Sequence, residues 1–451
     1  MKNFFKHITI PIFVFILFFN FNTIFGITDE EILCNKAIVM DTDSGSVLYS
    51  KGAYDKVYPA STTKILTAIL AIENLKLDTP IVVSENAVKS TPEYSSVMGV
   101  KAGEIFSVKE LLYGLMLPSG NDAANVLAEA ISFNIDDFVK LMNEKAKQIG
   151  CLNTNFTNPH GFHDDNHYTT PYDMALITKY ALQNSDFREI IETKSVEIKA
   201  TNKTDTARKF TNTNKLVNKD YEGTYYYEYA TAGKTGFTDE ARGTLVTYGK
   251  KDDKNIIIAV FDGTQLVGNE VRYFDAKKLF EYAFNNFTKQ VILDSNKFEI
   301  KITDENTNYN YTLTLKDDIT SLINSNEYFY DYNDIDINFT NIDNIINNIE
   351  IYENNLKNEK IGTINIDFKG KNLLLNNNYD LYIRNYKNNN LFVINKENYK
   401  IFLAIILTIL IIILLIIKAN NKIKNNRNSK FTFDTNPSRI KLKHHKDSFK
   451  Y

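Results

Sequence analysis

The amino-acid sequence predicts an α/β sandwich built on an antiparallel sheet. Three observations predict it. Strand-like runs come first, at residues 36–51, and apolar residues at helical spacing dominate residues 84–184. Further strand-like runs between residues 224 and 263 then precede a closing helical pattern at residues 271–287. The chain has 451 residues, of which 43% are hydrophobic and 24% charged, which is ordinary for folded protein and enough for two domains.

The first two strands are predicted to form a hairpin, because Asp43, Ser44 and Gly45 lie between them. A helix is predicted to begin in the stretch PASTTKILTAIL, residues 59–70. The Ser and Thr hydroxyls there could cap the first turn by accepting from its free amides. Ser61 and Lys64 would then share one helix face, since residues i and i+3 are neighbours.

The middle and end of this first part follow the same logic. Apolar residues three and four positions apart predict helices in residues 107–131 and 170–183. Strands are predicted in TYYYEYATAGKTG, GTLVTYG and NIIIAVFDG, and the helix VRYFDAKKLFEYAFNNF closes the part at Phe287. Residues 27–287 are therefore predicted to be one domain.

A second, β-rich domain is predicted for residues 288–395. Its runs KFEIKITD, YNYTLTLKDD, IGTINIDF and YDLYIRNYK alternate in polarity and are separated by Asn- and Asp-rich turns.

The two ends of the chain predict export and anchoring. Lys2 and Lys6 precede an apolar run, so residues 1–26 are predicted to be a signal peptide, with an uncleaved anchor as the alternative. Residues 401–417 are uncharged, about one bilayer crossing, and residues 418–451 carry ten Lys or Arg against two Asp. The positive-inside rule places this tail in the cytoplasm and residues 27–400 outside, as a single-pass membrane protein. The exported part is acidic, which argues against nucleic acid as a partner.

The sequence predicts no cofactor or metal. It contains no His or Cys cluster at metal-ligand spacing and no phosphate-binding loop. The two cysteines, Cys34 and Cys151, allow a single disulfide, but a core of this size does not need one.

Three short motifs carry the chemistry. Ser61 and Lys64 form an S-x-x-K pattern on a helix, Ser119 and Asn121 form S-x-N between two helices, and residues 234–236 read K-T-G late in a strand. Each has an ordinary structural explanation by itself. In this order and on these elements, they resemble the active site of penicillin-recognising serine acyltransferases.

The resemblance is more specific than the motifs alone. PASTTKILTA, GKTGFTDEA and the stretch of residues 153–177 are similar to those of D-alanyl-D-alanine carboxypeptidases, among the low-molecular-mass penicillin-binding proteins. It spans roughly residues 37–287. It implies a β-lactamase/transpeptidase-like antiparallel sheet with helices on both sides. The layout of signal, catalytic domain, β-domain and C-terminal anchor also matches that family.

The resemblance implies a role for each motif residue. Ser61 is the expected nucleophile toward a peptidoglycan stem peptide ending in D-Ala-D-Ala, and β-lactam antibiotics are the expected inhibitors. Lys64 is the expected base, if burial and the charge of Lys234 lower its pKa. Ser119 is expected to relay a proton to the departing D-alanine, and Asn121 to hold the substrate backbone and Lys64.

The K-T-G strand is expected to bind substrate. Lys234 and Thr235 would recognise the terminal carboxylate, and Gly236 would let the peptide lie against the strand. The backbone amides of Ser61 and Phe237 would hold the oxyanion.

Three further residues bear on the site. His160 is expected to support a loop beside the site, and Arg242 lies either near the substrate carboxylate or in solvent. Family members often carry a basic residue where this chain has Ile256, so the second carboxylate-binding cation is left open.

Two alternative functions remain at this point. A β-lactamase shares the three motifs, but its E-x-x-x-N glutamate is missing from the comparable stretch NPHGFHDDNHY. A non-catalytic β-lactam sensor or wall-binding protein would place its domain after the transmembrane helices, and it would not need all three motifs intact.

Overall fold

The computed structural model describes residues 26–266, 269–304, 309–325, 335–340, 360–368 and 378–388, which divide into two compact units. The first unit comprises the described residues up to Ile292 together with residues 319–325. The second unit begins at Leu293. The predicted signal peptide, apart from Gly26, and the predicted span 401–417 and tail 418–451 lie outside the described residues. Within the described ranges, no helix combines the length and apolarity that crossing a bilayer requires.

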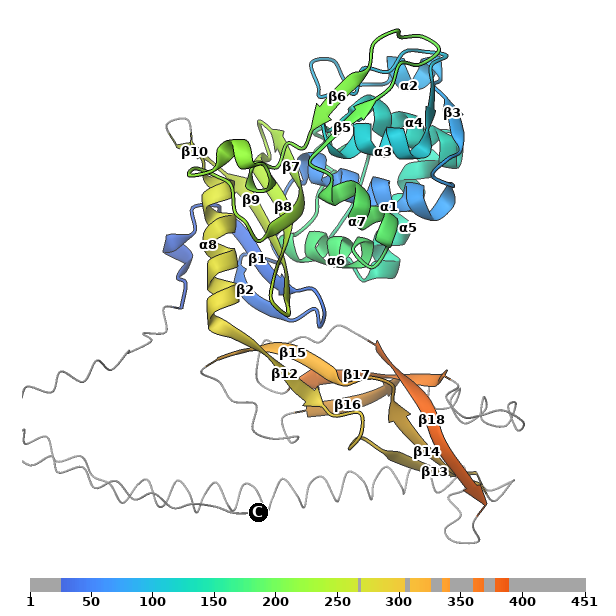
Figure 1. Cartoon of the computed structure of the whole chain (residues 1–451), viewed down its shortest axis with the longest axis vertical. Helices are drawn as coiled ribbons and strands as arrows, with labels where there is room; N and C mark the ends of the chain where they lie inside the picture. Colours follow the sequence, from blue (N-terminus) through green and yellow to red (C-terminus); the bar gives the residue numbers. More distant parts are fainter. Residues whose placement is uncertain are drawn as a thin grey trace, which may run out of the picture. The chain divides into compact units, whose positions relative to one another are not determined.

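A five-stranded antiparallel sheet forms the centre of the first unit (Figure 1). Its strand order is β2 (Val47–Lys51), β1 (Lys36–Asp41), β9 (Lys254–Gly263), β8 (Arg242–Lys251) and β7 (Ala230–Thr238). The predicted hairpin of β1 and β2 is confirmed, with Gly45 at φ +79° in the turn. The K-T-G strand β7 lies at the edge of the sheet, so one side of its backbone has no neighbouring strand in it.

Both faces of the sheet are covered, because alternate residues of the central strands face opposite sides. Val39, Ile256 and Ile258 pack with α8 (Val271–Asn286) on one face. Ile38 and Ile257 lie on the other face, in the cluster that includes α1 (Lys64–Asn74) and α6 (Pro171–Ala181). Figure 1 shows α8, in yellow, along one face and the helical layer on the other. The predicted antiparallel sheet with helices on both sides is confirmed.

The helical layer is less continuous than the sequence predicts. It contains α2 (Glu85–Lys89), α3 (Val108–Met116), α4 (Asn121–Ser132), α5 (Ile135–Ile149) and α7 (Ser185–Glu192). Residues 150–170 form a loop instead of a helix, and α6 begins after it with Thr170 as its cap and Pro171 in its first turn. Two small antiparallel pairs were not predicted: β3 (Pro80–Val82) with β4 (Ile105–Ser107), and β5 (Ser195–Ile198) with β6 (Arg208–Thr211).

The predicted capping of the first helix is wrong. Ser61 lies in a 3₁₀ turn, η2 (Ala60–Thr63), and α1 begins only at Lys64, with no side-chain cap on either element. The hydroxyls of Thr62 and Thr63 donate to the carbonyl oxygens of Pro59 and Ala60 instead. The Ser61 hydroxyl therefore caps neither element and can form a hydrogen bond with another side chain.

Short elements complete the first unit: η1 (Asp29–Glu31), η3 (Lys215–Val217), η4 (Lys219–Tyr221), the pair β10 (Gln265–Leu266) and β11 (Asn269–Glu270), and the pair β12 (Phe287–Leu293) and β15 (Ile319–Asn324). The second unit holds an antiparallel sheet in the order β13 (Ile300–Asp304), β14 (Tyr309–Leu315), β18 (Asn378–Asn388), β17 (Lys360–Phe368) and β16 (Ile335–Thr340). The four predicted β-runs fall on β13, β14, β17 and β18. The exact domain boundaries, 287/288 and 395, stay predictions.

Candidate active site

Three separate elements bring the predicted residues together. Ser61 and Lys64 lie where η2 meets α1, Ser119 and Asn121 lie in the turn that begins α4, and Lys234 lies on β7. Hydrogen bonds link each of these elements to the next through a lysine ammonium group.

Lys64 contacts the other members of a first group of residues, which includes Ser61 and Asn121. Its Nζ lies 2.9 Å from Ser61 Oγ, 2.6 Å from Asn121 Oδ1 and 2.7 Å from the carbonyl oxygen of His160. The side chain is completely buried. Burial and, next, the charge of Lys234 hold the pKa of Lys64 well below its ordinary value, so both predicted causes are present. A neutral amine in contact with Ser61 can accept the hydroxyl proton.

His160 contributes its backbone rather than its imidazole. Its ring is buried, and burial together with the nearby Lys64 charge holds its pKa well below the ordinary value, so the ring stays neutral. Its Nδ1 accepts from the amide of Phe162 at 3.1 Å, within the same loop. These contacts are those of the loop support predicted for it.

Lys234 and Ser119 form the second group. Lys234 Nζ donates to Ser119 Oγ at 2.9 Å and to the carbonyl oxygen of Thr235 at 2.8 Å. The hydroxyl of Thr235 pairs with that of Thr213 at 2.7 Å. Burial, and then the charge of Arg272, lowers the pKa of Lys234 to about 7.

Arg272 is the residue beside the site that sequence reasoning missed. It lies at the start of α8, and its Nη1 donates to the carbonyl oxygens of Gly236, at 2.7 Å, and Thr244, at 3.2 Å. Ile256, the residue that left the second carboxylate-binding cation open, is buried on the α8 face of the sheet. A guanidinium group therefore lies beside the K-T-G strand. It belongs to a residue of a helix, 38 positions after Lys234 in the sequence, and no local motif predicts its position.

Position 236 requires a glycine, because atoms of other segments lie too close to leave room for a side chain. A Cβ at this position would lie 2.8 Å from the backbone nitrogen of Ser61 and 2.4 Å from Thr244 Oγ1. The amide of Ser61, the predicted nucleophile, thus lies directly beside β7 at Gly236, the neighbour in sequence of Phe237, which is 54% exposed. This brings together the two residues whose amides were predicted to hold an oxyanion.

Two residues of this cluster have a strained backbone. Ala60, before the nucleophile, has φ +48°, and Ser119 has φ +67°, both in the left-handed region that non-glycine residues seldom adopt. Gly161, at φ +85°, packs so tightly on the first of these turns that a Cβ would lie 1.7 Å from the carbonyl oxygen of Ala60. The 158–161 loop therefore fixes the position of the Ser61 turn.

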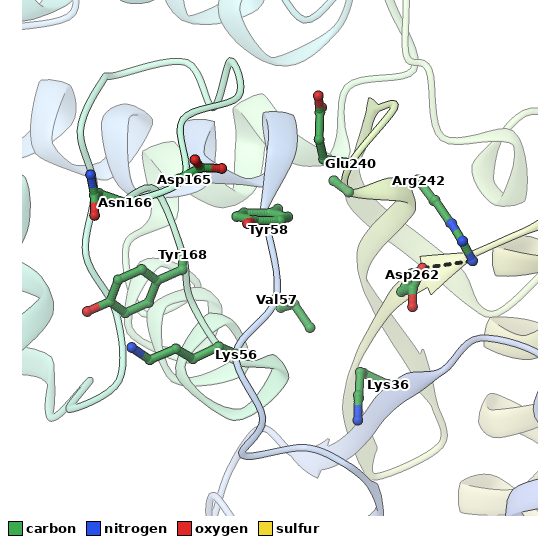
Figure 2. A pocket seen from close by; sticks show the side chains of 11 residues that line it. Lys36, Lys56, Val57, Tyr58, Asp165, Asn166, Tyr168, Glu240, Arg242 and Asp262 are labelled. Carbon is green, nitrogen blue, oxygen red and sulfur yellow. Dashed lines mark ion pairs between the residues drawn. The ribbon is translucent and has the colours of Figure 1, made fainter.

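Arg242 lies apart from this cluster. Its Nη1 pairs with Asp262 at 3.3 Å, at the end of the sheet where β7 turns into β8 (Figure 2). Both cysteines are buried and unpaired, so the possible disulfide does not form. No group of His, Cys, Asp or Glu in the described part of the chain is arranged to hold a metal ion.

The chain matches one family model. The family is described as D-alanyl-D-alanine carboxypeptidase, and the match covers residues 24–265, more than half of the chain.

Individual relatives agree with this match. The D-alanyl-D-alanine carboxypeptidase DacF of Bacillus subtilis is 33% identical over 273 residues, covering 59% of this chain and 66% of that protein. The crystal structure of a Streptomyces DD-transpeptidase is 31% identical, with a TM-score of 0.52, and covers 56% of this chain and 98% of that one. A D-alanyl-D-alanine carboxypeptidase structure from Mycobacterium tuberculosis is 30% identical with a TM-score of 0.51, covering 56% and 92%. The antiparallel sheet and its helical layers are thus the transpeptidase-like fold of these proteins.

Proposed function

Because the chain belongs to the D-alanyl-D-alanine carboxypeptidase family, we propose that it removes the terminal D-alanine from peptidoglycan stem peptides through an acyl-enzyme on Ser61. The observation that carries the proposal is the contact of a buried, pKa-lowered lysine amine with that hydroxyl at 2.9 Å. A serine hydroxyl is a weak nucleophile without such a base.

Acylation follows from the geometry. Ser61 Oγ attacks the carbonyl carbon of the penultimate D-alanine while Lys64 takes the hydroxyl proton. The negative oxygen that develops is held by the amides of Ser61 and Phe237. The C–N bond then breaks, and Ser119 relays the proton that Lys64 has taken from Ser61 to the departing D-alanine nitrogen. Ser119 is suited to this because Lys234 donates to its oxygen.

Selection of a free terminal carboxylate falls to the cations at β7. The strand β7 carries Lys234 and the hydroxyl of Thr235. The guanidinium of Arg272, from α8, contacts the same strand at Gly236. A carboxylate here would meet the charge of Lys234, which an internal peptide bond would leave unpaired. The guanidinium of Arg272 adds to the positive potential but is itself ion-paired with Glu270. This is the requirement of an exopeptidase.

Water completes the cycle by hydrolysing the ester, which restores the Ser61 hydroxyl. A β-lactam carries a strained amide and a carboxylate in similar positions, so it acylates the same serine. Its ring-opened product has no leaving group to diffuse away, and its release is slow.

The test uses a purified exported part of the chain or the full chain in detergent. With an N-acylated peptide ending in D-Ala-D-Ala, the wild type releases D-alanine, and Ser61→Ala lowers the rate by at least about 10³-fold, since loss of a nucleophile removes the covalent route. Ser185→Ala, an exposed serine at the start of α7, is the matched control. Equal release by Ser61→Ala would refute the proposal.

Labelled penicillin separates this function from the alternatives. The expected result is a long-lived adduct that maps to Ser61. Fast turnover of the adduct would indicate a β-lactamase, and an adduct without any peptide hydrolysis would indicate a sensor.

We also propose that the site works outside the cytoplasmic membrane. The support is sequence alone: a basic and apolar start, an uncharged stretch at residues 401–417 and a basic tail. A stem peptide of the cell wall is reachable only from that side.

A further inference from the structure

A chain of buried hydrogen bonds runs from the loop before α6 to the turn η2. The backbone amide of Thr157 donates to His167 Nδ1 at 3.0 Å, and His167 Nε2 lies 2.8 Å from Thr63 Oγ1. The Thr63 hydroxyl donates in turn to the carbonyl oxygen of Ala60, also at 2.8 Å. The side chains of His167 and Thr63 are buried, so water does not compete for these bonds.

The groups at its two ends fix the direction of the chain. A backbone N–H only donates, so His167 Nδ1 is the acceptor and the ring proton lies on Nε2. The single proton of the Thr63 hydroxyl goes to the Ala60 carbonyl, which only accepts, so Thr63 receives the bond from His167. Burial lowers the pKa of His167 to about 3, so the ring remains neutral and keeps this tautomer at neutral pH.

The last acceptor, the Ala60 carbonyl, belongs to the same peptide unit as the amide of Ser61. This peptide bond is trans, and a peptide unit is planar, so its C=O and its N–H point in opposite directions. A bond that holds the carbonyl oxygen therefore also sets the direction of the Ser61 N–H. That amide is one of the two proposed oxyanion donors, and it lies beside β7 at Gly236.

The orientation of this peptide unit depends on support from outside. Ala60 has φ +48°, which a non-glycine residue keeps only where its surroundings hold it. It begins η2, a 3₁₀ turn, and the backbone hydrogen bonds of such a turn have poorer geometry than those of an α-helix. Gly161 packs on the Ala60 carbonyl but directs its own amide to Asn158 Oδ1. The Thr63 hydroxyl is therefore a side-chain donor placed to hold this carbonyl.

We propose that His167 and Thr63 are positioning residues that hold the Ser61 amide in the direction required of an oxyanion donor. Both side chains act through the planar peptide unit between Ala60 and Ser61. A hydrogen bond to the carbonyl also polarises this unit and strengthens its N–H as a donor. The assignment rests on the proposed function and adds a role for one residue inside the first motif, Thr63, and one outside all three, His167.

The first test removes the hydroxyl without changing the shape of the side chain, in the full chain. Thr63→Val leaves the Ala60 carbonyl without this donor. We expect the rate constant of acylation by labelled penicillin and kcat for D-alanine release to fall about 10- to 100-fold, at or below the loss caused by removing one whole oxyanion donor. KM should stay close to its wild-type value. Thr63→Ser restores the hydroxyl and should recover most of both rates.

Thr62→Val is the matched control. The hydroxyl of Thr62 also donates to a carbonyl oxygen of this turn, that of Pro59 at 2.7 Å, and its side chain is equally buried. The Pro59 carbonyl belongs to the preceding peptide unit, and it also accepts from the Thr244 hydroxyl at 3.2 Å. This variant should therefore be acylated at close to the wild-type rate.

A pair of substitutions at His167 tests the direction of the chain. The side-chain nitrogen of Gln reaches the position of the imidazole Nε2, whereas that of Asn reaches only the position of Nδ1. His167→Gln should therefore keep the bond to Thr63 and most of the acylation rate, and His167→Asn should lose it as Thr63→Val does. Neither variant adds a charge, so the midpoints of the pH profile should not move. This pair carries the test if Thr63→Val shows no cooperative urea transition.

A tetrahedral analogue distinguishes an effect on the oxyanion from a general disturbance of the site. A peptide boronic acid bonds to a serine hydroxyl and places a boron-bound oxygen where the oxyanion develops. Its inhibition constant should rise in Thr63→Val and His167→Asn by the same factor by which kcat/KM falls, because both quantities report binding of a tetrahedral species.

The outcomes separate this assignment from the proposed function. Wild-type acylation by both Thr63→Val and His167→Asn, an equal loss in Thr62→Val, or an unchanged inhibition constant for the boronic acid would overturn the positioning role. A wild type that is acylated by penicillin but releases no D-alanine would refute the carboxypeptidase and leave the acylation test of His167 and Thr63 intact. A wild type that does neither would refute both.

Discussion

At the scale of single residues, the two lysines define opposite requirements for charge. In the proposed mechanism, Lys64 must be neutral to accept the proton of Ser61, whereas Lys234 must be charged to bind a carboxylate. Burial lowers the pKa of both, and for Lys234 to about 7. Two lysines of one cleft thus titrate in the range where lysines ordinarily do not.

The pH profile of kcat/KM should therefore be bell-shaped. Activity rises with pH as Lys64 loses its proton, and it falls above about 7 as Lys234 loses its own. Lys234→Arg should remove the falling limb, because a guanidinium stays charged, although KM will rise from the poorer fit. Initial rates at low substrate concentration between pH 5 and about 10 measure this. A falling limb that is unchanged in Lys234→Arg would assign it to another group.

The predictability of the site differs between its residues. Seven of the eight predicted residues belong to three short motifs, and the eighth, Phe237, directly follows the third, so their spacing along the chain was enough to predict them. Arg272 could not be predicted from the sequence, because its contact with Gly236 depends on the packing of α8 against the sheet. Tertiary contacts of this kind leave no pattern in the local sequence.

At the scale of elements, the loop of residues 150–170 acts as a support for the nucleophile's turn. Gly161 makes this testable, because its missing Cβ leaves room for the Ala60 carbonyl. Gly161→Ala should displace that turn and lower the rate of acylation by labelled penicillin by at least about 100-fold, the size of effect that the loss of one oxyanion donor has.

Gly150→Ala is the matched control for backbone strain. Gly150 also has a positive φ, +100°, but no atom lies within 4 Å of the Cβ position. This variant should lose about 1 kcal/mol of stability, measured by urea unfolding, and keep its acylation rate. If both variants acylate equally slowly, strain rather than the clash with Ala60 is responsible.

The elements that the sequence predicted well are those whose burial is periodic. The residues of the central strands alternate between the two clusters of the core, and α8 buries residues three and four positions apart in one of them. The β5–β6 pair was missed because its residues are mostly exposed and polar, so burial leaves no signature. The loop of residues 150–170 was included in a helical region because strong helical patterns flank it. The side-chain hydrogen bonds that hold it, such as Asn143 to Phe156, cannot be read from spacing.

At the scale of the whole molecule, we propose that the uncharged stretch of residues 401–417 anchors the enzyme to the membrane. Deleting residues 401–417 should move the protein from the membrane fraction to the soluble fraction, while acylation by labelled penicillin is retained, because the site lies wholly in the first unit. Deleting only the tail, residues 418–451, should leave it in the membrane fraction. Fractionation with immunodetection measures both. A protein that stays with membranes after the first deletion would point to the amino-terminal segment as its anchor.

The burial of both thiols gives the molecule a surface without sulfhydryl groups. Cys34 and Cys151 are the only cysteines of the chain, and neither is exposed or bonded to another. One cysteine introduced at Tyr94, whose side chain is fully exposed, would thus be the sole target for a maleimide dye. Since the nearby Ser96 carbonyl accepts from the amide of Asn121 at 2.8 Å, a fluorophore there would report on antibiotic occupancy without prior removal of the native cysteines.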